Sequence, residues 1–268
     1  MGAHVGGRAL AKLAPDLPDA APFEAAGGPP PCLLLHGFTG TPFEIRPLGV
    51  ALAAAGFAVR APLLPGHGTT VDDLMDRRRV DWTEATEEEA VALAREGPIV
   101  LVGLSLGALL SLRIAAVRPE IVRGLVCLAP ALRLRRWTEW PLAVLSRLRA
   151  APRIGIPKMG GSDIRDRAMR ERNPSYRAQP LRGAVQLFRL ARDVRGLLGR
   201  VTAPILCIHG ARDRTVPPHA TDEVLRGVAS AERQRVILPE SGHVLPIDVE
   251  RDRVAEEVVR FVRRVGAR

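Results

Sequence analysis

The amino-acid sequence predicts a doubly wound α/β fold, in which helices cover both faces of a mostly parallel β-sheet. Short apolar runs recur along the chain, for example at 98–102 and 124–129. These runs lack the apolar–polar alternation of a strand with one face in water, so we expect both faces to be buried. Helical patterns alternate with the runs across short turns, which is typical of a parallel sheet.

The expected elements follow one another regularly along most of the chain. The run at 31–35 predicts a first core strand that stops at a turn formed by His36 and Gly37. The helix expected at 82–95 is acidic in its first turns, where carboxylates meet the positive end of the helix dipole. The other predicted strands are 57–63, 98–102, 124–129, 205–209 and 236–238, and the other predicted helices are 45–55, 106–117 and 254–265.

Residues 131–197 do not follow this alternation of strands and helices. They contain several prolines and glycines and two apolar patches at helical spacing, at 137–148 and 181–190. We expect a helical lid insertion that lies over one edge of the sheet. Residues 1–22 predict an irregular N-terminal extension, because they are rich in Ala, Pro and Gly, and residues 23–268 predict one α/β domain that includes the lid.

Composition indicates a globular protein, with 47% hydrophobic and 25% charged residues. Cys32, Cys127 and Cys207 lie inside apolar runs and are expected to be buried, reduced thiols rather than disulfides or zinc ligands. No run approaches the ~20 apolar residues of a membrane span, and the first residues lack the apolar core of a signal peptide. We therefore expect a soluble cytoplasmic protein.

Positive charge is concentrated in the insertion. Residues 131–200 hold 17 basic and 5 acidic residues, whereas the whole chain has a net charge of +10. This segment forms either an electropositive surface that meets anionic lipid or acidic substrates, or an Arg-rich face exposed to water. No zinc-finger, helix-turn-helix or aromatic RNA-binding motif is present in the sequence, so nucleic acid is not an expected partner.

A glycine-flanked serine carries the strongest functional signal. The motif Gly103-Leu104-Ser105-Leu106-Gly107 falls between the predicted strand 98–102 and the predicted helix 106–117. In this context it predicts a nucleophile, because the glycines permit a tight turn that lifts the hydroxyl above the sheet edge. The alternative is a small residue in a turn. A serine hydroxyl is a weak nucleophile until a base takes its proton.

The base is expected near the C-terminus, with an orienting acid between it and the serine in the sequence. Of the six histidines, His243 alone lies after the last predicted strand and before the last predicted helix. His36 is the nearest rival, but it precedes the serine and fits a turn residue better. The sequence therefore predicts His243 as the base.

Asp213 follows the predicted strand 205–209 and is the expected orienting acid. Such an acid holds the imidazole in the right tautomer and stabilises the imidazolium. Asp248 is its rival and also fits an N-cap of the last helix, while Glu240 fits a solvated loop charge. Two backbone N–H groups must also stabilise a tetrahedral oxyanion, and by position these belong to Phe38 and Leu106.

Taken together, these motifs resemble the bacterial carboxylesterases and monoacylglycerol lipases of the α/β-hydrolase superfamily. The resemblance covers roughly Phe23 to the C-terminus. It rests mainly on residues 35–42 (LHGFTGTP), 65–69 (PGHGT), 103–107 (GLSLG), 161–164 (GSDI) and 241–244 (SGHV). Ala108, where many relatives carry a further glycine, is one departure, and the N-terminal extension and the arginine-rich lid are two others.

The resemblance implies an α/β-hydrolase fold with a Ser105–His243–Asp213 triad and an oxyanion hole at Phe38 and Leu106. It also implies a serine carboxylic-ester hydrolase that forms an acyl-enzyme on short- to medium-chain esters or monoacylglycerols, without a cofactor or metal. Lid side chains such as Trp137, Trp140 and Leu187 either line an acyl-chain pocket or pack on the core domain. Alternatives are an acyltransferase or thioesterase, a catalytically silent binding module, and weak membrane-surface contact through the basic lid.

Overall fold

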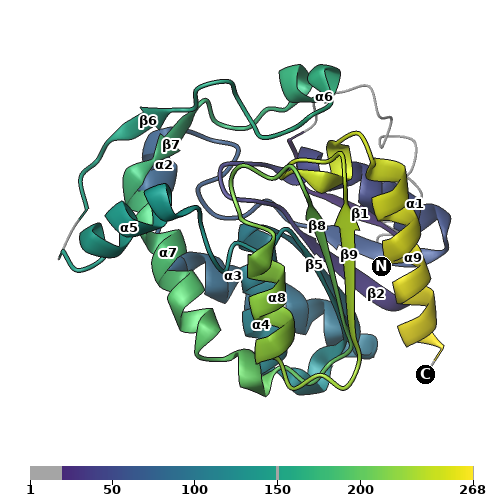
Figure 1. The fold of residues 1–268 in the computed structure, drawn as a ribbon. Coiled ribbons are helices and arrows are strands. Elements are labelled where there is room, and N and C mark those ends of the chain that lie inside the picture. The colour runs from purple at the N-terminus through teal and green to yellow at the C-terminus, as the bar shows by residue number, and fades with distance from the viewer. Residues whose placement is uncertain (1–19, 149–150, 268) are drawn as a thin grey trace, which may run out of the picture.

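The centre of the molecule is a seven-stranded sheet with the strand order β1-β3-β2-β4-β5-β8-β9 (Figure 1). The computed structural model describes residues 20–148 and 151–267. β1 is antiparallel to β3, and the other neighbouring strands are parallel. The strands of this sheet are β1 (Phe23–Ala25), β2 (Gly28–Leu35), β3 (Phe57–Ala61), β4 (Ile99–Leu104), β5 (Val122–Leu128), β8 (Ile205–Gly210) and β9 (Arg233–Leu238).

Helices cover both faces of the sheet (Figure 1). Successive strand residues point into two separate cores: Leu33 and Leu101 into one, Leu34 and Val102 into the other. The predicted doubly wound fold is therefore confirmed. Helices α1 (Arg46–Ala54) and α9 (Arg251–Gly266) cover one face, and α3 (Arg79–Leu93), α4 (Leu106–Val117), α7 (Leu181–Arg195) and α8 (His219–Gly227) cover the other.

Each strand and helix predicted from periodicity is present to within a few residues. Three helices were not predicted. α2 (Val71–Asp76) is one short stretch of helix, and its start is set by a side-chain cap in which Thr70 Oγ1 accepts a hydrogen bond from the N–H of Asp73 at 3.1 Å. α6 (Arg167–Arg172) and α8 are also short. Elements of this length carry too few apolar positions to show a period.

The insertion between β5 and β8 consists of α5 (Arg136–Leu145), β6 (Gly155–Pro157), α6 (Arg167–Arg172), β7 (Ala178–Pro180) and α7. β6 and β7 form a separate antiparallel ribbon, α7 packs on α4, and α5 packs on α7 (Figure 1). The insertion also contacts the loops at the carboxyl ends of the parallel strands: the N–H of Tyr176 donates to Thr39 O at 3.0 Å.

The apolar residues of the insertion divide into two groups. Leu187 is 5% exposed and belongs to the main core, so of the two expectations packing on the core domain holds for it. Trp137 and Trp140 are 76% and 72% exposed, so they do not pack on the core domain. They give α5 an apolar outer surface.

The ends of the chain and its cysteines complete the description. Most of the extension expected at 1–22 lies outside the described residues, and residues 20–22 form no helix or strand. Cys32, Cys127 and Cys207 are buried free thiols, as predicted. Within residues 20–148 and 151–267, no helix combines the length and the hydropathy needed to cross a bilayer.

Gly107 marks the closest approach of α4 to the sheet. A Cβ atom added there would lie 2.0 Å from Leu35 O, whereas one added at Gly199 meets no atom within 4 Å. We expect Gly107→Ala to lower the free energy of unfolding by about 1–3 kcal/mol or more, since the backbone cannot yield cheaply. Urea denaturation measures the loss, with Gly199→Ala as the matched control. Equal midpoints for the two variants would contradict this expectation.

Candidate active site

Ser105 occupies the tight turn between β4 and α4. Its φ of 54° and ψ of −104° lie in a region that residues other than glycine rarely adopt. The turn is held by a hydrogen bond from the N–H of Ser105 to Leu128 O at 2.9 Å. A Cβ at Gly103 would lie 2.2 Å from Gly107 O, so only glycine fits beside the turn. This strained strand–turn–helix geometry is that of a nucleophile elbow.

The loop after β2 lies directly beside Ser105. A Cβ built on Gly37 would lie 3.7 Å from Ser105 Cβ. Phe38 follows in the same loop, and Leu106 is the first residue of α4, where a backbone N–H has no partner within the helix. The two residues predicted as oxyanion donors therefore come from neighbouring segments at the same edge of the sheet.

Asp213 and His243 are hydrogen-bonded to each other. His243 Nδ1 lies 2.7 Å from Asp213 Oδ2, and neither residue is more than 8% exposed. The other carboxylate oxygen of Asp213 accepts the N–H groups of Thr215 and Val216 at 2.8 and 2.7 Å. A carboxylate held in this way fixes the imidazole ring, with Nδ1 protonated and Nε2 left to act as a base.

The two groups change each other's pKa. Burial alone would lower the pKa of His243, but the attraction and hydrogen bond of Asp213, with weaker contributions from Asp163 and Glu44, raise it above its ordinary value. Burial alone would raise the pKa of Asp213, yet the neighbouring histidines hold it well below its usual range. Asp213 therefore stays ionised, and the raised pKa of His243 makes the ring a stronger base.

The rival candidates have other partners. Asp248 bonds no histidine in the described part of the chain, and it is not the N-cap of α9, because that position is Glu250. Instead, the carboxylate of Asp248 accepts the N–H of Gly242 at 2.7 Å. Glu240 is 58% exposed and pairs with Arg212, as a solvated loop charge does.

His36 is a structural turn residue. Its Nδ1 lies 2.9 Å from Gly37 O, and its Nε2 accepts the N–H of Leu64 at 3.1 Å. Both ring nitrogens are therefore engaged in holding loops. Burial, together with repulsion from His67, lowers the pKa of His36 well below its usual value. The ring is neutral and does not compete with His243.

Two neighbours of the pair were not assigned a role from the sequence. His209 Nε2 lies 3.1 Å from Asp213 Oδ2, so the carboxylate contacts two histidines. Asp163, from the insertion, accepts the N–H of His243 at its backbone oxygen at 2.9 Å. A spacing of four residues between His209 and Asp213 was the one available signal for the first contact. The second contact joins residues far apart in the sequence, which no local pattern predicts.

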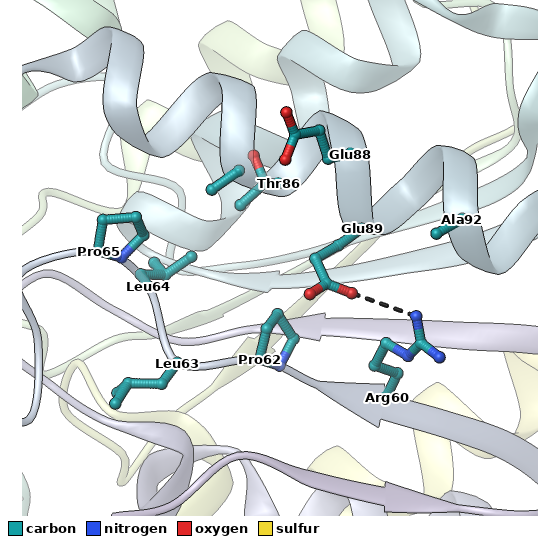
Figure 2. A pocket seen from close by; sticks show the side chains of 10 residues that line it. Arg60, Pro62, Leu63, Leu64, Pro65, Thr86, Glu88, Glu89 and Ala92 are labelled. Carbon is teal, nitrogen blue, oxygen red and sulfur yellow. Dashed lines mark hydrogen bonds and ion pairs between the residues drawn. The ribbon is translucent and has the colours of Figure 1, made fainter.

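The structure contains several cavities. One of about 410 Å³ lies between the loop after β3 and α3, is crossed by the Arg60–Glu89 ion pair and contains none of the candidate residues (Figure 2). Another of about 500 Å³ is lined by Asp163, Arg214 and Thr215, next to the His243 loop. Among the described residues there is no group of three or more His, Cys, Asp or Glu side chains that could hold a metal ion.

The sheet topology, the elbow at Ser105 and the buried Asp213–His243 pair are those of an α/β-hydrolase. The family model Hydrolase_4, described as serine aminopeptidase, S33, matches residues 31–250, so the chain belongs to this family of serine hydrolases. The predicted resemblance to bacterial carboxylesterases and monoacylglycerol lipases is confirmed.

Known relatives match the chain over nearly their whole length. A thermostable monoacylglycerol lipase of Bacillus sp. (strain H-257) is 33% identical over 92% of this chain and 96% of the relative. A carboxylesterase of Bacillus subtilis (strain 168) is 28% identical over 91% of this chain and 96% of the relative. A solved structure from work on the metagenome-derived lipolytic enzymes LipS and LipT is 31% identical, with a TM-score of 0.84 over 92% of this chain and 99% of that one.

Asp248 anchors the loop that carries His243. Besides Gly242, its carboxylate accepts the N–H groups of Arg165, Asp166 and Val249 at 2.8–2.9 Å. We expect Asp248→Ala to cost at least about 2 kcal/mol of unfolding free energy, because it leaves several partly buried donors unpaired.

The exposed Asp252 provides the matched control for this prediction. Asp252→Ala should cost less than about 1 kcal/mol, the value of a carboxylate in the first turn of a helix. Both variants are compared by chemical denaturation. A loss for Asp248→Ala no larger than that for Asp252→Ala would contradict the anchoring role.

Proposed function

We propose that this chain is a serine carboxylic-ester hydrolase in which Ser105 is the nucleophile, His243 the general base and Asp213 the orienting acid. The observation that carries the proposal is the buried Asp213–His243 pair at the same sheet edge as the strained Ser105 turn. The esterase and lipase names of its relatives support the same chemistry. The proposed substrates are short- to medium-chain esters or monoacylglycerols.

The reaction proceeds in two halves. The Ser105 oxygen attacks the ester carbonyl carbon while His243 Nε2 takes the hydroxyl proton, and the carbonyl oxygen becomes an oxyanion that accepts hydrogen bonds from the N–H groups of Phe38 and Leu106. His243 then gives the proton to the leaving alcohol, and the acyl group stays on Ser105. In the second half His243 removes a proton from water, the hydroxide attacks the acyl carbon, and the acid leaves as Ser105 recovers its proton.

We further propose that residues 131–197 act as the lid of this site. The contacts of Thr39 with Tyr176 and of His243 with Asp163 support this role, since they join the insertion to the loops that carry the proposed machinery. Weak contact with a membrane surface remains a prediction, supported by the exposed Trp137 and Trp140 beside Arg136, the first residue of α5.

Ser105→Ala tests the nucleophile directly. We expect the native chain to react with a fluorophosphonate probe and to hydrolyse p-nitrophenyl butyrate, and the variant to lose the label and at least about 10³-fold in kcat. Ser111→Ala, which changes a buried serine in α4, is the matched control and should keep both. Labelling of Ser105→Ala at the native rate would overturn the assignment.

The pH dependence tests the Asp213–His243 pair. Only neutral His243 accepts a proton, so kcat/KM should fall as the pH drops through the pKa of His243, which lies above the ordinary ~6.5. Asp213→Asn removes the attraction that raises this pKa. The variant should lose about 10⁴-fold in kcat, and its acid limb should move to lower pH.

The measurement is kcat/KM across a pH range of about 4 to 9. Asp252→Asn, at an exposed position of α9, serves as the control and should reproduce the native profile. If kcat/KM of Asp213→Asn falls at the same low pH as that of the native chain, the fall reflects the titration of a group other than His243. Acyl-chain preference follows from comparing p-nitrophenyl esters of increasing length with monoacylglycerols.

A further inference from the structure

A buried carboxylate, that of Glu44, packs against the loop after β2, residues 36–41. Glu44 is 4% exposed, and its carboxylate accepts a hydrogen bond from the backbone N–H of Gly37. A Cβ added at Gly40 would lie 2.0 Å from Glu44 Oε2, so the carboxylate fills the space inside the loop. Asn173, from the insertion, donates its side-chain N–H to Glu44 Oε1 at 3.1 Å.

The same loop also contacts Lys158, which precedes α6 in the insertion. The ammonium group of Lys158 donates to Thr39 Oγ1 and, at 2.9 Å, to Ser175 Oγ. Thr39 itself has a φ of 66°, a left-handed conformation that a β-branched residue rarely adopts. Its backbone oxygen accepts the N–H of Tyr176 at 3.0 Å. Thus three residues of the insertion, Lys158, Ser175 and Tyr176, contact Thr39.

The hydrogen bonds form a directed chain that ends on Phe38. The ammonium can only donate, so Thr39 Oγ1 accepts from it and keeps its own hydrogen for another partner. Thr39 Oγ1 donates to Phe38 O at 2.6 Å. Phe38 is therefore fixed on both sides, because Gly37 N–H is bound by Glu44 and Phe38 C=O is bound by Thr39. Linked hydrogen bonds of this kind polarise and strengthen one another.

The residue type fits this task. Lys158 is the one lysine among the 17 basic residues of 131–200. A compact ammonium with three rotatable donors suits two hydroxyl oxygens, whereas a planar guanidinium suits a carboxylate. Burial lowers the pKa of Lys158 to about 8, and the attraction of Glu44 opposes this change. The chain thus keeps a partly desolvated charge beside the loop, although desolvation is unfavourable unless the group is well hydrogen-bonded.

We propose that Lys158 is a positioning residue of the oxyanion hole, which acts through Thr39 to aim the N–H of Phe38 at the developing oxyanion. This inference rests on the proposed function. Lys158 touches neither the ester nor the triad. The N–H of Phe38 points at the oxyanion only when Lys158 reaches Thr39. Stabilisation of the transition state therefore depends on the position of the insertion.

The test measures kcat and KM for the native chain, Lys158→Met, Thr39→Ala and the double variant, with p-nitrophenyl butyrate as substrate. Lys158→Met keeps the length of the side chain and removes the ammonium. We expect it to lower kcat about 10-fold or more while KM changes less than about threefold, because an oxyanion donor acts in the transition state. The double variant should lose no more than the worse single variant, because both changes break one chain of hydrogen bonds.

Inhibitors separate positioning from general damage. A trifluoromethyl ketone forms a tetrahedral adduct that carries an oxyanion, whereas the matching methyl ketone binds without one. Lys158→Met should weaken the first by the same factor as kcat and leave the second unchanged. Arg147→Met removes one exposed charge of the insertion and is the matched control, expected to behave as the native chain in every assay.

The outcomes are distinct. Lys158→Met with native kcat, additive losses in the double variant, or equal weakening of both ketones would each overturn the positioning role. If Lys158→Met does not fold, as judged by its thermal transition, Thr39→Ala carries the test, because it removes the same acceptor and leaves the ammonium. Ser105→Ala is assayed alongside: hydrolysis that survives in it overturns the proposed function, whereas an inactive Ser105→Ala beside an unaffected Lys158→Met overturns only the role of Lys158.

Discussion

The contact between the first turn of α4 and the ends of β2 and β4 is the constraint on which the candidate site depends. Gly103 and Gly107 let two backbones meet with no side chain between them, and any larger residue would collide with Gly107 O or Leu35 O. This approach forces the left-handed turn at Ser105. It also brings the loop after β2 beside the serine, so that one packing contact sets the positions of the proposed nucleophile and of two neighbouring backbone segments.

A second feature of the site is the density of charge that it holds away from water. Asp213 is fully buried, yet it stays ionised because two histidines and two backbone N–H groups surround it. Glu44, next to the loop after β2, and Lys158, in the insertion, are two further ionisable groups that are buried or half-buried. In a low-dielectric interior such groups interact strongly and cost much when unpaired. The same environment strengthens any interaction with charge that develops on a bound ester.

The insertion takes part in the hydrogen bonds of the candidate site. Asp163 binds the backbone of His243, Tyr176 and Lys158 bind Thr39, and Asn173 binds Glu44. These contacts reach the loops after β2 and β9, which the core domain alone would leave open. The exposed Trp137 and Trp140 of α5 lie on the outer side of the same segment, next to Arg136. Movement of the insertion would therefore alter the geometry of the loops beneath it.

Much of the fold was predictable because its strands are buried on both faces. Runs such as residues 99–104 have no polar positions, and hydrophobic burial leaves them one arrangement, a covered parallel sheet. The positions of Ser105, Asp213 and His243 in loops after strands were predictable for the same reason, since each of these strands is recognisable in the sequence. Short elements such as α2, with few apolar positions, were not predictable.

What the sequence by itself determined is which residues end each strand, because local periodicity sets the strands and the loops follow. Only the tertiary structure decided which polar groups of separate segments form hydrogen bonds with one another. The contacts of Asp248 with Gly242, of His209 with Asp213 and of Lys158 with Thr39 depend on how separate segments pack. The physical reason is that a hydrogen bond depends on distance and direction in space, and neither is encoded by spacing along the chain.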